Sequence, residues 1–332
     1  MRHSNHNSAL IYQSVAVAIG IVLTLIKFTA WGLTNSNAIL TDALENIVNV
    51  LAGGFGWYSL WLSARPKDKN HPYGHGKIEF VSTGFEGGLI FLAGSIIIVK
   101  AVFNLFQPTE IARLQDGIGL VFLTGVVNFI MGIILLRRGK KTQSLVLKAE
   151  GKHLLSDSYS SAGLLIGLGL VLLTDLVWLD HILAIGFGSI ILYTGFQLIR
   201  TALAGIMDEA DYDLINGMVD ALEKQRHDNW IDVHNFRVIK YGNDYHVDCH
   251  LTLPWYFNVE EGHEEVEKFE QLLCSHDPSV SELFIHVDPC QMPEDCKICH
   301  KKDCALRKAD FVTHITWELD NVMTNRKHTA TD

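Results

Sequence analysis

Apolar residues are distributed unevenly along this chain of 332 residues. Residues 9–202 hold repeated apolar runs close to the roughly 20 residues that a helix needs to cross a bilayer, whereas residues 203–332 hold none. The pattern predicts a membrane all-α bundle of six transmembrane helices, followed by a soluble part. We expect the spans at residues 9–32, 37–62, 80–105, 116–136, 146–173 and 181–201.

Lys and Arg residues alternate between the connections of these spans. Segments 65–77 and 137–141 are rich in them, whereas segments 34–37 and 174–180 contain none. By the positive-inside rule, the basic connections and both termini are cytoplasmic. The first eight residues lack the pattern of a cleavable signal peptide, so we expect a multi-pass protein of the cytoplasmic (inner) membrane.

The soluble part has a different periodicity. An apolar helical repeat precedes residues 231–240 and 245–253, which have the pattern of two strands. Asn258 and Glu261 form a capping box before a second helix, and residues 283–287 follow as a short third strand. The order αββαβ predicts a small α+β domain with its helices on one face of a sheet.

These patterns divide the chain into four regions. We expect a cytoplasmic N-terminus, a six-span transmembrane domain, a cytoplasmic α+β domain and a Cys-rich C-terminal extension, at residues 1–8, 9–202, 203–289 and 290–332. We expect about the last ten residues of the extension to be disordered.

The formal charge separates the two halves further. Residues 1–202 carry 15 Lys and Arg against 11 Asp and Glu, whereas residues 203–332 carry 12 against 26. A soluble part this acidic is a poor partner for nucleic acid or for an anionic membrane surface, so we expect no nucleic-acid partner. It suits cations or a basic partner, and the alternative is simply a well-solvated surface.

Two predicted spans carry ionisable residues in matching positions. Asp42 and Asn46 are four residues apart in the second span, and His153 and Asp157 are four apart in the fifth, so each pair lies on one helix face. If the pairs face each other, they supply one imidazole, two carboxylates and an amide oxygen, a tetrahedral set for a divalent metal. A metal must displace protons from these groups, which predicts coupling of metal and proton movement. The alternative is a set of interhelical polar contacts.

Further metal ligands are expected outside the spans. The connection after the second span holds Asp68, His71 and His75 between Pro and Gly turns, although two loop histidines are also compatible with simple solvation. The soluble part holds five histidines within about fifty residues of an acidic domain. Strand periodicity puts Asp248 and His250 on one face of their strand, and His286 and Asp288 on one face of theirs. If the two faces converge, these residues form an imidazole and carboxylate metal site.

The C-terminal extension contains four closely spaced cysteines. Cys290, Cys296, Cys299 and Cys304 have the spacing C-x5-C-x2-C-x4-C. Four thiolates at this spacing in a reducing compartment predict a structural four-cysteine Zn²⁺ site, with an iron–sulfur cluster or free thiols as the alternatives.

These motifs together resemble the cation diffusion facilitator family, particularly its bacterial ferrous-iron and zinc efflux members. The resemblance covers about residues 10–290 and rests on both intramembrane pairs, the loop His71-Pro-Tyr-Gly-His75-Gly-Lys77 and the segment Ile285-His286-Val287-Asp288-Pro289. It implies a homodimer with a ferredoxin-like cytoplasmic domain. It also implies a transport site at Asp42, Asn46, His153 and Asp157, a loop site at Asp68, His71 and His75, and dimer-interface metals at His234, His250, His263, His286 and Asp288.

We therefore expect a secondary transporter, not an enzyme, that exchanges Zn²⁺ or Fe²⁺ for protons as a cation/proton antiporter in membrane lipid. Asn46 departs from the family pattern, in which a carboxylate is usual, so this site has one negative charge fewer. The rival hypothesis is a membrane-anchored metal sensor or storage protein, in which the soluble His and Cys residues act and the bundle is an anchor.

Overall fold

The computed structural model describes residues 2–34, 37–106, 118–174, 178–242 and 244–331, with some side chains inside these ranges left out. The chain splits into two compact units, Met1–Met207 and Asp208–Asp332, which we call the helical unit and the sheet unit. Each unit is described here by itself.

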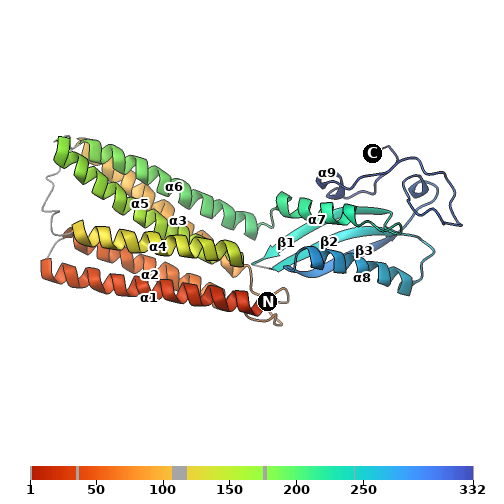
Figure 1. Cartoon of the computed structure of the whole chain (residues 1–332), viewed down its shortest axis with the longest axis horizontal. Helices are drawn as coiled ribbons and strands as arrows, with labels where there is room; N and C mark the ends of the chain where they lie inside the picture. Colours follow the sequence, from red (N-terminus) through yellow and green to blue (C-terminus); the bar gives the residue numbers. More distant parts are fainter. Residues whose placement is uncertain (1, 35–36, 107–117, 175–177, 243, 332) are drawn as a thin grey trace. The chain divides into compact units, whose positions relative to one another are not determined.

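The helical unit consists of long helices (Figure 1). Each predicted span corresponds to one helix: α1 (Arg2–Thr34), α2 (Asn37–Ser63), α3 (Ile78–Phe106), α4 (Ile118–Thr142), α5 (Leu145–Thr174) and α6 (Trp178–Ile206). Among the described residues, four helices hold stretches long and apolar enough to cross a membrane, at Ser8–Thr29, Ile78–Phe103, Phe122–Thr142 and Ile185–Ile206. The protein therefore contains a transmembrane helical domain.

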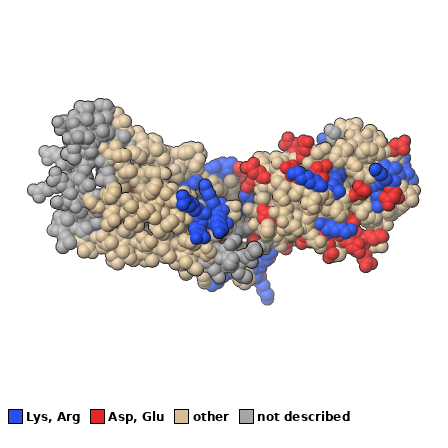
Figure 2. Space-filling model, viewed as in Figure 1, with Lys and Arg blue, Asp and Glu red and all other residues tan. Residues whose placement is uncertain are grey.

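Glycines allow the helices of this unit to approach closely. A Cβ atom at Gly195 of α6 would lie 2.5 Å from the backbone nitrogen of Phe91 in α3, and one at Gly94 would lie 2.7 Å from the nitrogen of Leu192. Because lipid provides no hydrophobic force between helices, such close packing is a main source of their association. The outer surface is apolar, with large exposed side chains such as Leu25 and Phe103, and it is mostly free of charged groups in Figure 2.

The sheet unit begins with α7 (Tyr212–Lys224), β1 (Asp232–Tyr241), β2 (Asp244–Leu253), α8 (Val259–His276) and β3 (Val280–Pro289). The strand order is β1-β2-β3, with β1 and β2 antiparallel and β2 and β3 parallel. The predicted α+β domain is thus confirmed, and the capping box of Asn258 and Glu261 begins α8 as expected. Figure 2 shows groups of Asp, Glu, Lys and Arg side chains scattered over the visible face of this unit.

One apolar core holds the sheet unit together. It contains Val247, Cys249 and Leu251, which alternate along β2, together with apolar residues of α7 and α8 such as Met218 and Phe269. Because alternate residues of a strand point to opposite faces, both helices cover one face of the sheet. The other face of β2 carries His246, Asp248 and His250.

The C-terminal extension contains little regular structure. Within its described residues it has one 3-10 turn, Asp295–Lys297, and the short helix α9 (Leu319–Val322). Our expectation that the last residues are disordered was wrong. His328 is buried, and its imidazole bonds to Asp232. The Thr324 carbonyl accepts a 2.7 Å hydrogen bond from the Asn235 N–H, so the end of the chain is held against β1 at two points.

Candidate metal sites

The helices α2 and α5 meet at Asp157. The amide of Asn49 in α2 donates a 3.0 Å hydrogen bond to Asp157 Oδ2, and Nε2 of His153, one turn earlier in α5, lies 3.7 Å from Asp157 Oδ1. His153 is buried. Asp157 therefore contacts a polar side chain of the second span, although Asn49 is not one of the predicted ligands.

The second-span pair is described only in part. Asn46 is buried, and its Oδ1 accepts a 2.9 Å hydrogen bond from the Lys27 ammonium group of α1. Asp42 lies within α2, but its side chain falls outside the described part of the structure. Asn46 thus faces a cation supplied by the protein itself.

Two buried carboxylates extend this polar cluster beyond the predicted residues. Glu86 Oε1 of α3 lies 3.5 Å from His153 Nδ1, and Glu150 accepts a 2.9 Å hydrogen bond from Gln13 of α1. Both glutamates are buried. Spacing could have identified Glu150, because it precedes His153 by three residues and Asp157 by seven and so shares their helix face. Glu86 comes from another helix and has no such signal.

The loop residues Asp68, His71 and His75 form one cluster, in which their candidate ligand atoms lie within 4.8 Å of one another. Asp68 lies 3.2 Å from His71 Nδ1 and 3.3 Å from His75 Nε2. The backbone N–H of His71 donates to the Asp68 carboxylate at 2.8 Å and lowers the pKa of that carboxyl group. The loop thus presents an ionised carboxylate beside two imidazoles.

Strand register brings the sheet-unit histidines together. His234 on β1 pairs with His250 on β2, which pairs with His286 on β3, so the three imidazoles form one row across the sheet. Asp288 follows His286 by two residues on β3. Its Oδ2 lies 3.1 Å from His250 Nδ1 and 3.6 Å from His234 Nε2. His234, His250 and Asp288 have ligand atoms within 4.8 Å of one another, a donor set that fits a divalent transition metal.

The remaining two predicted ligands of this unit lie at its surface. His286 is 3.6 Å from Asp288 but its side chain is 66% exposed. His263 on α8 is 70% exposed and faces Glu267 at 3.5 Å, outside the cluster. Within the described sheet unit, the structure therefore groups three of the five predicted ligands and leaves His263 apart.

Two family models match the chain over most of its length. Residues 14–207 match the cation efflux transmembrane domain, and residues 210–290 match the cytoplasmic domain of cation efflux proteins, a dimerisation domain. The chain belongs to the cation efflux family, also called the cation diffusion facilitators. It is therefore a multi-pass membrane transporter of that family, as its resemblance predicts.

Relatives align with this cation efflux protein along most of their own lengths. An uncharacterised transporter of Synechocystis sp. is 29% identical over 283 residues, covering 85% of this chain and 91% of the relative. The cation-efflux pump FieF of Salmonella typhi is 27% identical and covers 83% of this chain and 91% of the pump. The FieF pump of Salmonella arizonae is 28% identical and covers 85% of this chain and 93% of the pump.

The C-terminal extension of this cation efflux protein lies beyond the matched segments, yet it reaches the histidine row. His328 is hydrogen-bonded to one oxygen of Asp232, whose other oxygen accepts a 2.9 Å bond from His234 Nδ1. Burial opposes ionisation of Asp232, but these two bonds outweigh it and lower the pKa of its carboxyl group to about 2. The bond to Asp232 leaves His234 Nε2 facing Asp288.

Sequence reasoning did not identify Asp232 or His328 as part of this site. Asp232 could have been found by strand periodicity, because it shares a sheet face with His234 two residues later. No local pattern could have found His328, since it is 96 residues away from Asp232 along the chain. The four predicted cysteines of the extension line one pocket, which we treat separately below.

Proposed function

We propose that this transporter moves a divalent transition-metal cation, Zn²⁺ or Fe²⁺, out of the cytoplasm in exchange for protons. The observation that supports it is the position of the His153 imidazole, between the carboxylates of Asp157 and Glu86 within the helical unit. Mixed nitrogen and oxygen donors suit these cations. Ionisable groups in membrane spans cost about 2.5 to 3.5 kcal/mol each on insertion scales, so they are retained for function.

In this proposal the substrate enters between α2 and α5 and is bound by Asp42, Asn46, His153 and Asp157. Two hydrogen bonds hold the site when no metal is bound: Asn49 donates to Asp157 and Lys27 donates to Asn46. The arriving cation replaces both donors. Departure of the Lys27 ammonium group also removes a positive charge that would repel a dication.

His153 provides the link to protons. Its Nε2 faces Asp157, where the metal binds, and its Nδ1 faces Glu86. A protonated imidazole cannot ligate through Nε2, so metal entry expels a proton and proton return favours metal release. Glu86 is the buried carboxylate that exchanges this proton with His153.

The cytoplasmic metals have a regulatory role in this proposal. Two copies form a homodimer through ferredoxin-like domains, and the exposed His263 and His286 of each copy contribute to metals at the interface with the other. Binding there neutralises acidic residues and biases the transporter between inward-open and outward-open states. Residues 1–8, 9–202, 203–289 and 290–332 then form the N-terminus, the six-span domain, the cytoplasmic domain and the extension, with both termini cytoplasmic at the inner membrane.

Asp157→Ala tests the proposal most directly. Protein reconstituted in proteoliposomes with an internal pH dye should alkalinise the lumen when Zn²⁺ is added outside, because zinc enters in exchange for lumenal protons, and Asp157→Ala should abolish that response. Asp157→Asn keeps the shape and should fail as well, because the charge is lost. Ser189→Ala on α6 is the matched control, since Ser189 is exposed and bonds only to the Ile185 carbonyl among the contacts described.

The two possible results separate transport from the rival function. Metal-driven proton movement that survives in both Asp157 variants would contradict the transport site. If the wild type moves no metal at all but binds Zn²⁺ through its sheet unit, the sensor or storage hypothesis is favoured instead. Parallel assays with Fe²⁺ under anaerobic conditions identify the preferred metal.

A further inference from the structure

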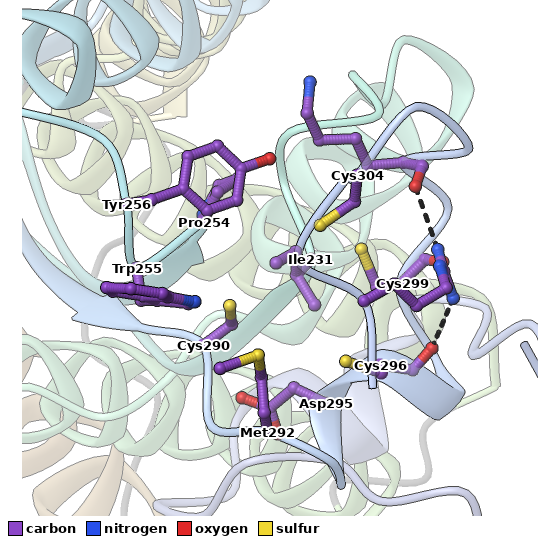
Figure 3. Close-up of a pocket in the computed structure, with 12 residues that line it drawn as sticks. Ile231, Pro254, Trp255, Tyr256, Cys290, Met292, Asp295, Cys296, Cys299 and Cys304 are labelled. Carbon is purple, nitrogen blue, oxygen red and sulfur yellow. Dashed lines mark hydrogen bonds between the residues drawn. The ribbon is translucent and has the colours of Figure 1, made fainter. Parts of the chain in front are cut away.

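The four cysteines of the C-terminal extension face one small pocket. Cys290, Cys296, Cys299 and Cys304 line a cavity of about 20 Å³, closed on one side by Trp255 and Tyr256. Figure 3 shows their sulfur atoms directed toward the shared space. All four are reduced in the structure. Residues that are up to 14 positions apart in the sequence therefore line one pocket.

The segment that carries these cysteines has little regular structure of its own. Its described residues form one short 3-10 turn and the four-residue helix α9. The apolar cluster beside the pocket is small, with Ile231, Ile298, Cys299 and Ile315 as its buried members. Small segments without a sizeable core generally need a disulfide or a metal to hold one structure.

Two cations, Arg307 and Lys301, line the pocket together with the cysteines. They offset the net charge of −2 that four thiolates and one Zn²⁺ ion would have.

Arg307 fixes the turn on which the middle cysteines lie. Its guanidinium group donates to the carbonyl oxygens of Cys296, Cys299 and Lys301 at 2.8, 2.8 and 2.9 Å. The backbone of the C-x2-C segment is therefore positioned before any metal binds. The nearby His300 is engaged elsewhere, because its Nε2 lies 2.7 Å from His314 Nδ1. The pocket thus favours four sulfur ligands over three sulfurs and one imidazole.

We propose that Cys290, Cys296, Cys299 and Cys304 bind one structural Zn²⁺ ion, separate from the transported cation, that stabilises the C-terminal extension. Binding replaces four S–H bonds by four Zn–S bonds and releases four protons to solvent, and no electron is transferred. Among the described residues, the donor groups that lie within 4.8 Å of one another are the loop and histidine clusters. The four thiols are not among these groups, so metal binding requires their side chains to rotate around the fixed turn until each sulfur lies about 2.3 Å from zinc.

Metal content of the full-length protein in detergent tests the proposal. We compare the wild type with Cys296→Ser/Cys299→Ser, and use Cys249→Ala/Cys274→Ala as the control that removes equally many thiols outside the pocket. After dialysis against a weak chelator, the wild type and the control should retain about one zinc ion per chain more than the serine variant. Equal zinc in all three proteins would overturn the proposal.

A second measurement avoids any effect of the substitutions on folding. Wild type exchanged with Co²⁺ should show the intense near-ultraviolet charge-transfer absorption of cobalt thiolate bonds and the visible bands of a tetrahedral ion. Absence of these bands, acid-labile sulfide with iron, or loss of titratable thiols to disulfides in zinc-free protein would each contradict the zinc site. The serine variant should keep Asp157-dependent transport, so the result is independent of the transport hypothesis.

Discussion

The helical unit and the sheet unit bring ionisable residues together by different geometric rules. In the helical unit, His153 lies beside Asp157 of its own helix and beside Glu86 of α3, and Asp157 is bonded to Asn49 of α2. The cluster therefore depends on how separate helices pack. In the sheet unit, His234, His250 and His286 are direct neighbours in strand register. A helix repeat determines only which face a residue occupies, whereas a sheet register also determines its neighbour. The intramembrane site should therefore be the more sensitive of the two to distant packing changes.

Gly195→Leu should have the largest effect on this comparison. A Cβ at Gly195 would lie 2.5 Å from the Phe91 nitrogen and 2.8 Å from the Gly87 carbonyl oxygen, so a leucine forces α6 away from α3, the helix that carries Glu86. We expect a destabilisation above about 3 kcal/mol and loss of transport. Thermal unfolding in detergent and proteoliposome transport measure the two effects.

Gly88→Leu is the matched control in α3. A Cβ at Gly88 meets no atom within 4 Å, so the larger side chain fits and the transport rate should stay near that of the wild type. Zinc binding by the sheet unit should survive in both variants. Equal behaviour of the two leucine variants would mean that close approach of α3 and α6 does not position the site.

Asp288→Asn should have the next largest effect, and it acts on the sheet unit. The carboxylate contacts both His250 and His234, so its loss removes the one charged donor of the cluster and should weaken zinc binding by about 100-fold. Calorimetric titration in an Asp157→Ala background measures this loss with the transport site removed. Asp248→Asn is the control on the neighbouring strand, because Asp248 pairs with Arg237 and should leave the affinity unchanged. Similar losses in both variants would contradict the assignment.

The sequence was informative wherever one local rule decides the outcome. Apolar runs located the six long helices, although α1 begins at Arg2 instead of residue 9 and α4 ends at Thr142 instead of residue 136, and the Asn258 capping box located the start of α8. Periodicity placed His250 on the polar face of β2 and His153 with Asp157 on one helix face. The resemblance added the family, which the matches to both domains confirm.

The missed residues that no local pattern could identify come from contacts between separate elements. Lys27 reaches Asn46 from α1, and Glu86 reaches His153 from α3, so neither contact follows from the periodicity of one helix. The last ten residues were expected to be disordered because they are polar and terminal. Polarity was misleading there, since the buried partner of His328 is itself a polar group, Asp232.

His328→Ala should have the smallest effect of the three, and it connects the extension to the histidine row. Among the described contacts, His328 bonds to Asp232 and to no candidate ligand, so it acts through Asp232, which orients His234. Loss of a partner that orients a metal ligand typically weakens binding 10-fold to 100-fold, and we expect about 10-fold because Asp232 keeps its bond to His234. Titration of Zn²⁺ in the Asp157→Ala background measures this change in affinity.

His328→Asn supplies an amide N–H near the position of Nδ1 and should restore most of the affinity. If the ring has a purely structural role, asparagine should fail as alanine does. If neither variant changes zinc affinity, the extension does not act on this site, and the bond to Asp232 serves only to anchor the chain end.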